Sequence, residues 1–258
     1  MLNKFTNRLR YFIELSYNGS GYHGWQSQPN AITIQQTIEN SLQLILKNKK
    51  LKVVGAGRTD TGVHALQMYA HFDFDQNFNP ENLIFKLNSF LDKNIVINNI
   101  LKVHNESHAR FDAYLREYKY FLTSKKDVYN SHIKYYFTKK LDFNEISKAI
   151  EIIKKNTNFK SFCRSKTDVI NYECSINNFE FEVINSEVIF TISANRFLRN
   201  MVRAIIGTIL DVGLYKISIE ELKEIIDKSD RIHAGPSVPA HGLFLTKVEY
   251  PENIFLND

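Results

Sequence analysis

Apolar residues recur along the chain at two spacings, and the two alternate in a regular order. The stretch from Leu9 to Tyr17 is rich in aromatic and β-branched residues and predicts a strand. Between Ile34 and Ile45 the apolar positions follow a helical spacing, which predicts a helix with Thr33 as its N-cap. Two apolar segments follow, Leu51 to Val54 and Leu66 to Phe74, and we expect both to be strands.

The next elements complete a recognised arrangement. Pro80 is expected to begin a helix, because proline is favoured in the first helical turn and the apolar positions after it keep a helical spacing. Ile95 to Val103 predicts another strand. The order strand, helix, strand, strand, helix, strand is that of a ferredoxin-like unit.

The second half repeats this order of elements without repeating the sequence. Leu115 to Thr123 predicts a strand, Lys134 to Phe137 an additional one, and Asp142 the N-cap of a helix through Ile153. The remaining predicted elements are a hairpin of strands at 174–184 and 187–194, helices at about 196–213 and 218–228, and a closing strand at 243–250.

These elements predict an α+β fold made of two ferredoxin-like halves. We expect mainly antiparallel sheets side by side, helices on the outer faces and a cleft between the halves. No low-complexity linker separates the halves, and the boundary is expected between 104 and 110, which gives domains 1–106 and 107–258. The order of elements alone says little about function.

Composition is that of a soluble globular protein with a modest basic excess. The chain has 258 residues, of which 43% are hydrophobic and 24% charged, and its formal net charge is +5. This charge favours an anionic partner. The most apolar helix candidate, 197–214, is interrupted by Arg199, Arg203 and Asp211, so no membrane span is expected and the protein should be cytoplasmic. Cys163 and Cys174 form no metal-binding pair, and we expect no metal site.

A glycine-rich loop, Gly55 to Val63, separates the two strands that follow the first helix. It carries Arg58 and Asp60 in a backbone that must turn tightly or lie against other groups. A dinucleotide fingerprint would need glycine at Asp60, and a P-loop would need lysine at Val63, so phosphate binding is not predicted. The loop is either an ordinary polar hairpin or a holder for a carboxylate in a defined place.

Two further segments combine basic residues with aromatic or small ones. Strand alternation puts Arg116, Tyr118 and Tyr120 on one face, which suits either nucleic-acid binding or a half-buried amphipathic strand. On the predicted helix, one polar stripe runs through Arg196, Arg199, Asn200, Arg203 and Gly207. Arginine binds carboxylate and phosphate in a planar fork, and the glycine would permit another group to approach closely.

Five groups of residues, in this order, resemble the tRNA pseudouridine synthase A family (TruA) over almost the whole chain. The motifs are Tyr17-Asn18-Gly19-Ser20 with Gly24-Trp25-Gln26, Gly57-Arg58-Thr59-Asp60-Thr61-Gly62-Val63-His64, Ala109-Arg110-Phe111 with Arg116-Glu117-Tyr118, Asn200-Met201-Val202-Arg203 with Gly207, and Gly235-Pro236 with Gly242-Leu243-Phe244-Leu245. The resemblance implies an enzyme that isomerises uridine to pseudouridine in the anticodon stem-loop of tRNA, at positions 38, 39 or 40. It also implies a homodimer that needs no cofactor.

The resemblance also implies roles for individual residues. Asp60 matches the catalytic aspartate and Arg203 its arginine partner, which would favour the ionised carboxylate. Tyr118 matches the tyrosine that stacks on the target uracil, and Leu245 an apolar residue near that base. Arg58 matches an arginine thought to replace the flipped nucleotide, since a stacked base must leave the stem to react. We expect the basic residues of the strand and the helix, Arg116, Arg196 and Arg199, to bind RNA.

The chain departs from the family pattern in two places. Gln67-Met68 replaces the usual Gly-Gln, and Cys174 stands where an arginine is common. Both departures bear on RNA contacts more than on the reaction.

The two alternative functions are a non-catalytic RNA-binding protein with two modules and a retaining glycosidase. The glycosidase would need a second carboxylate near Asp60, such as Asp73, Asp75 or Glu117.

Overall fold

A computed structural model describes residues 8–164 and 170–256, which form two compact units. Unit 1 holds the described residues up to Tyr114 and those from Leu245 onward, and unit 2 spans Leu115–Phe244. Each unit combines helices with mainly antiparallel strands. The structure therefore belongs to the mixed α/β type that the pattern predicts.

The strands of unit 1 form a sheet around β1 (Leu9–Tyr17). It pairs antiparallel with β3 (His64–Phe74) on one side and β4 (Ile95–Val103) on the other. The short strand β2 (Val53–Gly55) pairs with β3, which is also a neighbour of β9 (Leu243–Glu249). The predicted strand ends are confirmed for β1 and β4, whereas β3 begins two residues earlier than expected.

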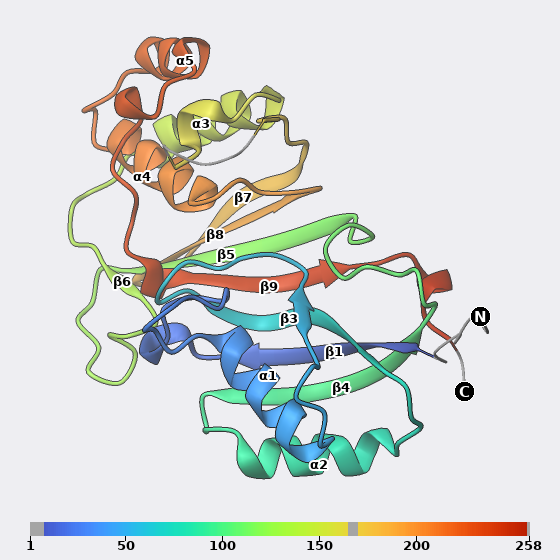
Figure 1. Cartoon of the computed structure of the whole chain (residues 1–258). Coiled ribbons are helices and arrows are strands. Elements are labelled where there is room, and N and C mark those ends of the chain that lie inside the picture. Colours follow the sequence, from blue (N-terminus) through green and yellow to red (C-terminus); the bar gives the residue numbers. More distant parts are fainter. Residues whose placement is uncertain (1–7, 165–169, 257–258) are drawn as a thin grey trace. The chain divides into compact units, whose positions relative to one another are not determined.

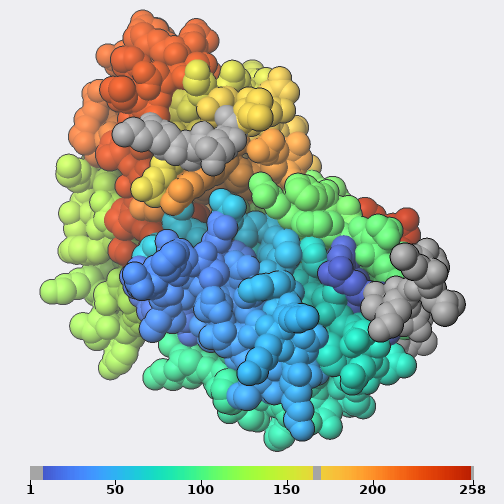
Figure 2. All heavy atoms as spheres, in the orientation of Figure 1, coloured from blue at the N-terminus to red at the C-terminus, as the bar shows by residue number. Residues whose placement is uncertain are grey.

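Helices α1 (Ile34–Ile45) and α2 (Pro80–Phe90) pack beside each other in unit 1 (Figure 1). The Thr33 side chain accepts a hydrogen bond from a first-turn N–H of α1, and Pro80 occupies the first turn of α2. Both predicted helix starts are therefore confirmed. In the space-filling view, atoms of the α1 region (blue) form much of the front surface of unit 1 (Figure 2).

In unit 2, β8 (Glu187–Ala194) lies between β5 (Leu115–Thr123) and β7 (Ile176–Ile184). Both pairings are antiparallel. The two-residue strand β6 (Tyr135–Tyr136) joins β5 in parallel. The turn of the predicted β7–β8 hairpin contains Asn185, whose φ of 55° is a conformation that asparagine tolerates.

Helices α3 (Phe143–Lys155) and α4 (Met201–Gly213) cover one face of these strands, and α5 (Ile219–Lys228) packs against the two helices (Figure 1). Asp142 caps α3, as the sequence pattern predicts, and Ser218 forms a capping box with α5. Helix α4 is the central one and is buried along most of its length. The position of α4 determines where Arg203 can lie.

Candidate active site

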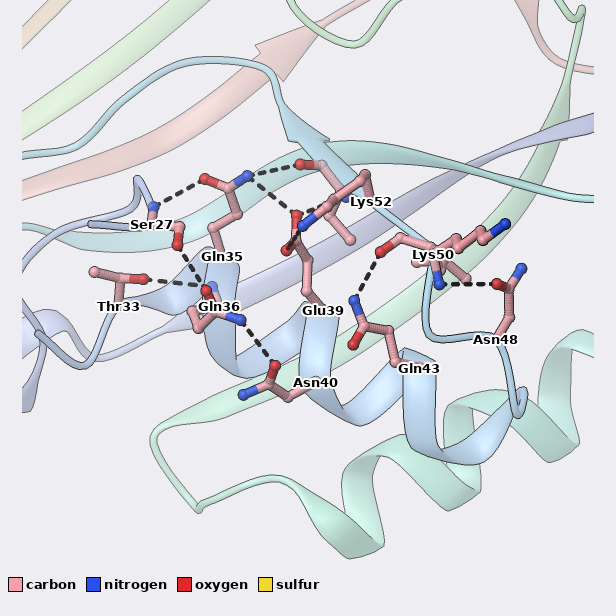
Figure 3. A network of polar contacts seen from close by, with 12 residues as sticks. Ser27, Thr33, Gln35, Gln36, Glu39, Asn40, Gln43, Asn48, Lys50 and Lys52 are labelled. Atoms are coloured by element: carbon pink, nitrogen blue, oxygen red, sulfur yellow. Dashed lines mark hydrogen bonds and ion pairs between the residues drawn. The ribbon is translucent and has the colours of Figure 1, made fainter. Parts of the chain in front are cut away.

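Side chains from one stripe of α1 hold the strand that leads into the glycine loop (Figure 3). Gln35 and Gln43 donate to the carbonyls of Val53 and Leu51, both over 2.9 Å, and Glu39 accepts the Val53 N–H over 3.0 Å. The three side chains are spaced four residues apart, so they lie in a row along the helix. Glu39 is only 2% exposed, which makes it a structural carboxylate. The outer edge of β2 is thereby bonded to the helix.

The glycine loop turns at Asp60. The Val63 N–H donates to the Asp60 carbonyl over 3.1 Å, and Gly62 has a φ of 79°. A four-residue turn closed by this bond, with a left-handed third residue, has the arrangement of a type II turn, which favours glycine at that place. Asp60 is half-buried and Arg58 is exposed. The expected tight turn at the carboxylate is therefore confirmed.

A second glycine-containing segment supports the loop from behind. A Cβ atom on Gly24, whose φ is 85°, would lie 2.6 Å from the Thr59 carbonyl oxygen, and one on Gly19 would lie 2.0 Å from that of Val63. Only glycine permits these approaches. The Trp25 N–H also donates to the Thr59 carbonyl over 3.1 Å. The residues on both sides of Asp60 are thus fixed by backbone contacts.

Two side-chain contacts complete this support. The Tyr17 hydroxyl is 2.8 Å from the Thr59 hydroxyl, and the pair is buried. The Gly19 N–H donates to His64 Nδ1 over 3.2 Å, and His64 is 1% exposed. These contacts give the motif residues around positions 17–25 a structural purpose: they hold the Asp60 turn.

The Ala109-Arg110-Phe111 motif is anchored to β3. Its Ala109 N–H donates to His71 Nδ1 over 3.1 Å, and the Tyr250 hydroxyl donates to the Ala109 carbonyl over 2.6 Å. Burial, together with the charges of Arg10 and His108, lowers the pKa of His71 to about 4. His71 is therefore a neutral hydrogen-bond acceptor at pH 7.

The predicted helix start at Arg196 is wrong, because α4 begins at Met201. Asn200 has a φ of 65°, a left-handed conformation that cannot continue an α-helix and that asparagine tolerates better than most residues. Arg196 and Arg199 therefore lie before the helix, half-buried and exposed respectively. They do not share a helical stripe with Arg203.

Arg203 is held by the loop that precedes β9. Its Nε donates to the Val238 carbonyl over 2.8 Å, while the Val238 N–H donates to the Arg203 carbonyl over 3.2 Å. One turn further along α4, a Cβ atom on Gly207 would lie 1.7 Å from the Pro236 carbonyl oxygen. The prediction that Gly207 admits a close neighbour is confirmed, and that neighbour is the loop that binds Arg203.

Tyr118 lies on β5 opposite Ile192 and is half-buried. The Phe197 ring meets it edge to face, with centroids 5.1 Å apart. Such a contact fixes the plane of the tyrosine ring. On the same strand face, Tyr120 is fully buried and Arg116 donates to the Asn195 carbonyl over 2.8 Å. This face of β5 is therefore buried at Tyr120 and partly exposed at Tyr118 and Arg116.

The remaining candidate residue is Leu245, which lies on β9 and is 2% exposed. Arg58, Asp60 and Leu245 belong to unit 1, and the candidate residues between 116 and 203 belong to unit 2. The described part of the chain contains no cluster of three His, Cys, Asp or Glu side chains able to hold a metal ion. Nor do the described residues include a helix that is long and apolar enough to cross a membrane.

Some residues that build the site escaped the sequence analysis. The polar spacing of Gln35, Glu39 and Gln43 is visible in the sequence and could have indicated their shared edge. Phe197 and the Val238 carbonyl gave no such signal. The first is one of many aromatic residues, and the second is a backbone group 35 positions from the arginine it binds.

Known proteins resemble the chain along nearly its whole length. It matches the family model described as tRNA pseudouridine synthase over residues 15–112 and 156–251. A tRNA pseudouridine synthase A from Parabacteroides distasonis is 45% identical, over 95% of this chain and 98% of that protein. A protein of the same name from Bacteroides fragilis is 43% identical, over 95% of this chain and 98% of that protein. Another from Bacillus subtilis is 35% identical, over 94% of this chain and 99% of that protein. The chain therefore belongs to the tRNA pseudouridine synthase A family of isomerases.

Proposed function

We propose that the protein converts uridine to pseudouridine in the anticodon stem-loop of tRNA, at positions 38, 39 or 40, and that Asp60 is its catalytic carboxylate. The observation that carries the proposal is the Asp60 turn. Its backbone is closed by the Val63 hydrogen bond and supported by two glycines, Gly19 and Gly24. A surface hairpin has no need of such support, whereas a catalytic group gains from being held in one geometry.

The reaction is an isomerisation whose atoms balance without a co-reactant. The bond between ribose C1′ and uracil N1 breaks, the uracil turns, and C1′ bonds to C5. The C5 proton leaves and N1 gains a proton. An ionised Asp60 serves either as the nucleophile, at the ribose or the base, or as the group that takes a proton. Both routes need a carboxylate that is charged and fixed.

Arg203 is the residue we assign to orient that carboxylate and balance its charge. A guanidinium beside a carboxylate orients it through paired hydrogen bonds. Because Arg203 Nε is bound to the Val238 carbonyl, a two-point contact with a carboxylate would use the Nη1 and Nη2 edge. The fork geometry explains why lysine would be a poor substitute.

The other candidate residues have roles in binding the RNA. Tyr118, with its plane fixed by Phe197, suits stacking on the flipped uracil. Leu245 supplies an apolar contact, and the exposed Arg58 can enter the stem in place of the base. Arg116, Arg196 and Arg199 are assigned to the RNA backbone.

We further propose that each unit is ferredoxin-like and that the enzyme works as a cytoplasmic homodimer without a cofactor. The order of elements from β1 to β4 supports the first point. The homodimer, the cellular location and the absence of a cofactor rest on the family resemblance.

The glycosidase alternative is weakened by the state of Asp73. Burial raises the pKa of Asp73, but hydrogen bonds and charge from Arg10 and Arg8 together lower it by more, so the net pKa is below the usual value. The Arg10 guanidinium lies 2.8 and 3.1 Å from the two carboxylate oxygens. A strand rises about 3.3 Å per residue, so Asp73 is roughly 30 Å from the loop end of β3 at His64. That distance is too great for a pair of glycosidase carboxylates, which lie about 5 to 10 Å apart.

The test uses a tRNA transcript with tritium at uracil C5. Pseudouridine formation replaces the C5 hydrogen, so the protein should release tritium and leave pseudouridine in the anticodon stem-loop. Free uracil in the product would instead indicate a glycosidase. Tight binding without tritium release from any tRNA would favour the non-catalytic RNA-binding protein and contradict the proposal.

A further inference from the structure

The loop that holds Arg203 is itself held by one hydroxyl group. Ser237 Oγ accepts a hydrogen bond from Asn200 Nδ2 over 2.6 Å and another from Arg231 Nη2 over 3.0 Å. A hydroxyl oxygen has two acceptor sites, so these donors use both. Ser237 thus joins the N-cap of α4 to the 3₁₀ turn Arg231–His233.

Each donor is restrained by other contacts. Asn200 is fixed in its left-handed conformation, where its carbonyl accepts the Ala204 N–H over 3.1 Å. Arg231 is half-buried, and its Nη1 donates to the Ala234 carbonyl over 3.2 Å. A guanidinium remains charged and can only donate, so it always needs an acceptor. The hydroxyl is therefore held from two independent directions.

The next residue after Ser237 is Val238, whose carbonyl accepts from Arg203 Nε. Two further contacts hold the same loop against α4: the Gly235 N–H donates to Thr208 Oγ1 over 2.9 Å, and Pro236 lies against Gly207. Any shift of Ser237 must move the Val238 carbonyl. The direction of the Arg203 guanidinium depends on the Val238 carbonyl, because the hydrogen bond from Arg203 Nε to this carbonyl orients the whole planar group.

We propose that Ser237, held by Asn200 and Arg231, is a positioning residue for the reaction and acts through Val238 on Arg203. This inference rests on the proposed role of Arg203 and goes beyond it, since it assigns a function to three side chains that need not touch the RNA. The network determines whether the Nη1 and Nη2 edge meets the reacting carboxylate in a two-point geometry.

The test compares Ser237→Ala with Ser237→Thr. Alanine removes the acceptor and leaves two donors without it, whereas threonine keeps the hydroxyl. Ser147→Ala is the matched control, because Ser147 is exposed and its hydroxyl bonds only to the Phe143 carbonyl of its own helix. The readouts are the single-turnover rate of tritium release, the Kd for the same tRNA transcript, and the thermal midpoint.

We expect Ser237→Ala to lower the single-turnover rate by about tenfold to a hundredfold, because displacements near 1 Å cost that much. The Kd should change by less than about threefold, since no RNA contact is lost. Ser237→Thr should restore most of the rate, and Ser147→Ala should match the wild type. Arg231→Met, which keeps an unbranched stem but removes the guanidinium donors, should lower the rate in the same way with an unchanged Kd.

A dependence on Arg203 separates positioning from general damage. In an Arg203→Lys background, which lacks the Nε contact, Ser237→Ala should cause little further loss of rate. Equal losses in both backgrounds would overturn the inference. So would a wild-type rate for Ser237→Ala, or a Kd that rises in step with the rate loss. If the wild-type protein releases no tritium from any tRNA transcript, it is the proposed function that has failed.

Discussion

Replacing Gly207 with alanine tests how Arg203 is held. The added Cβ atom would lie 1.7 Å from the Pro236 carbonyl oxygen, where ordinary contact begins at 3.4 Å. The two groups must therefore separate by about 1.7 Å, and the obstacle is backbone that cannot rotate away. The loop carries the Val238 carbonyl with it, so the hydrogen bond from Arg203 Nε should be lost.

The effects of Gly207→Ala on stability and on rate differ in size. Alanine in place of glycine favours a helix by about 1 kcal/mol, and overpacking costs about 1 to 3 kcal/mol. The net loss of unfolding free energy is then at most about 2 kcal/mol, or a few degrees in Tm. The rate should fall far more, by about a hundredfold, because Arg203 loses its alignment.

Gly213→Ala on the same helix is the matched control. Its Cβ atom would lie 2.8 Å from Cδ1 and Cγ1 of Ile146, which are side-chain atoms rather than the backbone of the loop that binds Arg203. We expect a wild-type rate of tritium release for Gly213→Ala, with Tm measured by differential scanning fluorimetry. A wild-type rate for Gly207→Ala, or an equal loss in both variants, would refute the role assigned to this loop.

Three other perturbations test the supports of unit 1. Glu39→Ala leaves the buried Val53 N–H without the Glu39 acceptor and should lower the unfolding free energy by about 1 to 3 kcal/mol, measured by chemical denaturation. Glu39→Gln keeps an acceptor oxygen and should lower the unfolding free energy by less. Gly62→Ala forces a side chain into a φ of 79°, which should cost about 1 to 2 kcal/mol and slow tritium release by disturbing Asp60. Burial and nearby positive charge lower the pKa of His71 to about 4, so at pH 4 to 6.5 the folded chain binds fewer protons at His71 than the unfolded chain does. The stability that comes from neutral His71 is therefore complete above pH 6.5 and is lost as the pH falls to 4. His71→Asn, which keeps an acceptor, should remove up to about 3 kcal/mol of this pH dependence, measured as the difference from the wild type at each pH.

Each of these predictions has an outcome that contradicts it. Equal stability of Glu39→Ala and Glu39→Gln would mean that the Val53 contact contributes nothing. Full activity of Gly62→Ala would show that the turn at Asp60 tolerates distortion. Parallel stability curves for wild type and His71→Asn between pH 4 and 6.5 would mean that His71 titrates normally in the folded chain.

Local signals in the sequence were enough to predict most of the secondary structure. The caps Thr33 and Asp142 begin their helices as expected, because a side chain that accepts a first-turn N–H acts locally. The start of α4 was not predictable in this way. The helical spacing of apolar residues extends to both sides of Asn200, and only the backbone conformation of Asn200 makes the helix begin at Met201.

The local geometry around the candidate residues was predicted less completely than the secondary structure. The glycine spacing indicated a tight turn at Asp60, and Gly207 indicated a close neighbour. The identity of that neighbour depends on contacts between residues far apart in the sequence, such as Arg203 with Val238. Backbone carbonyls are present at every position, so no residue pattern marks the one that aligns an arginine.

The most direct test of Asp60 as the catalytic carboxylate is the single-turnover rate of Asp60→Asn on a tritiated tRNA transcript, measured together with its Kd. Asparagine keeps the size of the side chain and removes the charge, and the turn that holds it is built from backbone contacts. We predict that Asp60→Asn folds, binds tRNA about as tightly as the wild type, releases no tritium and forms no pseudouridine. Turnover at a rate near that of the wild type would contradict the assignment of Asp60 as the catalytic carboxylate.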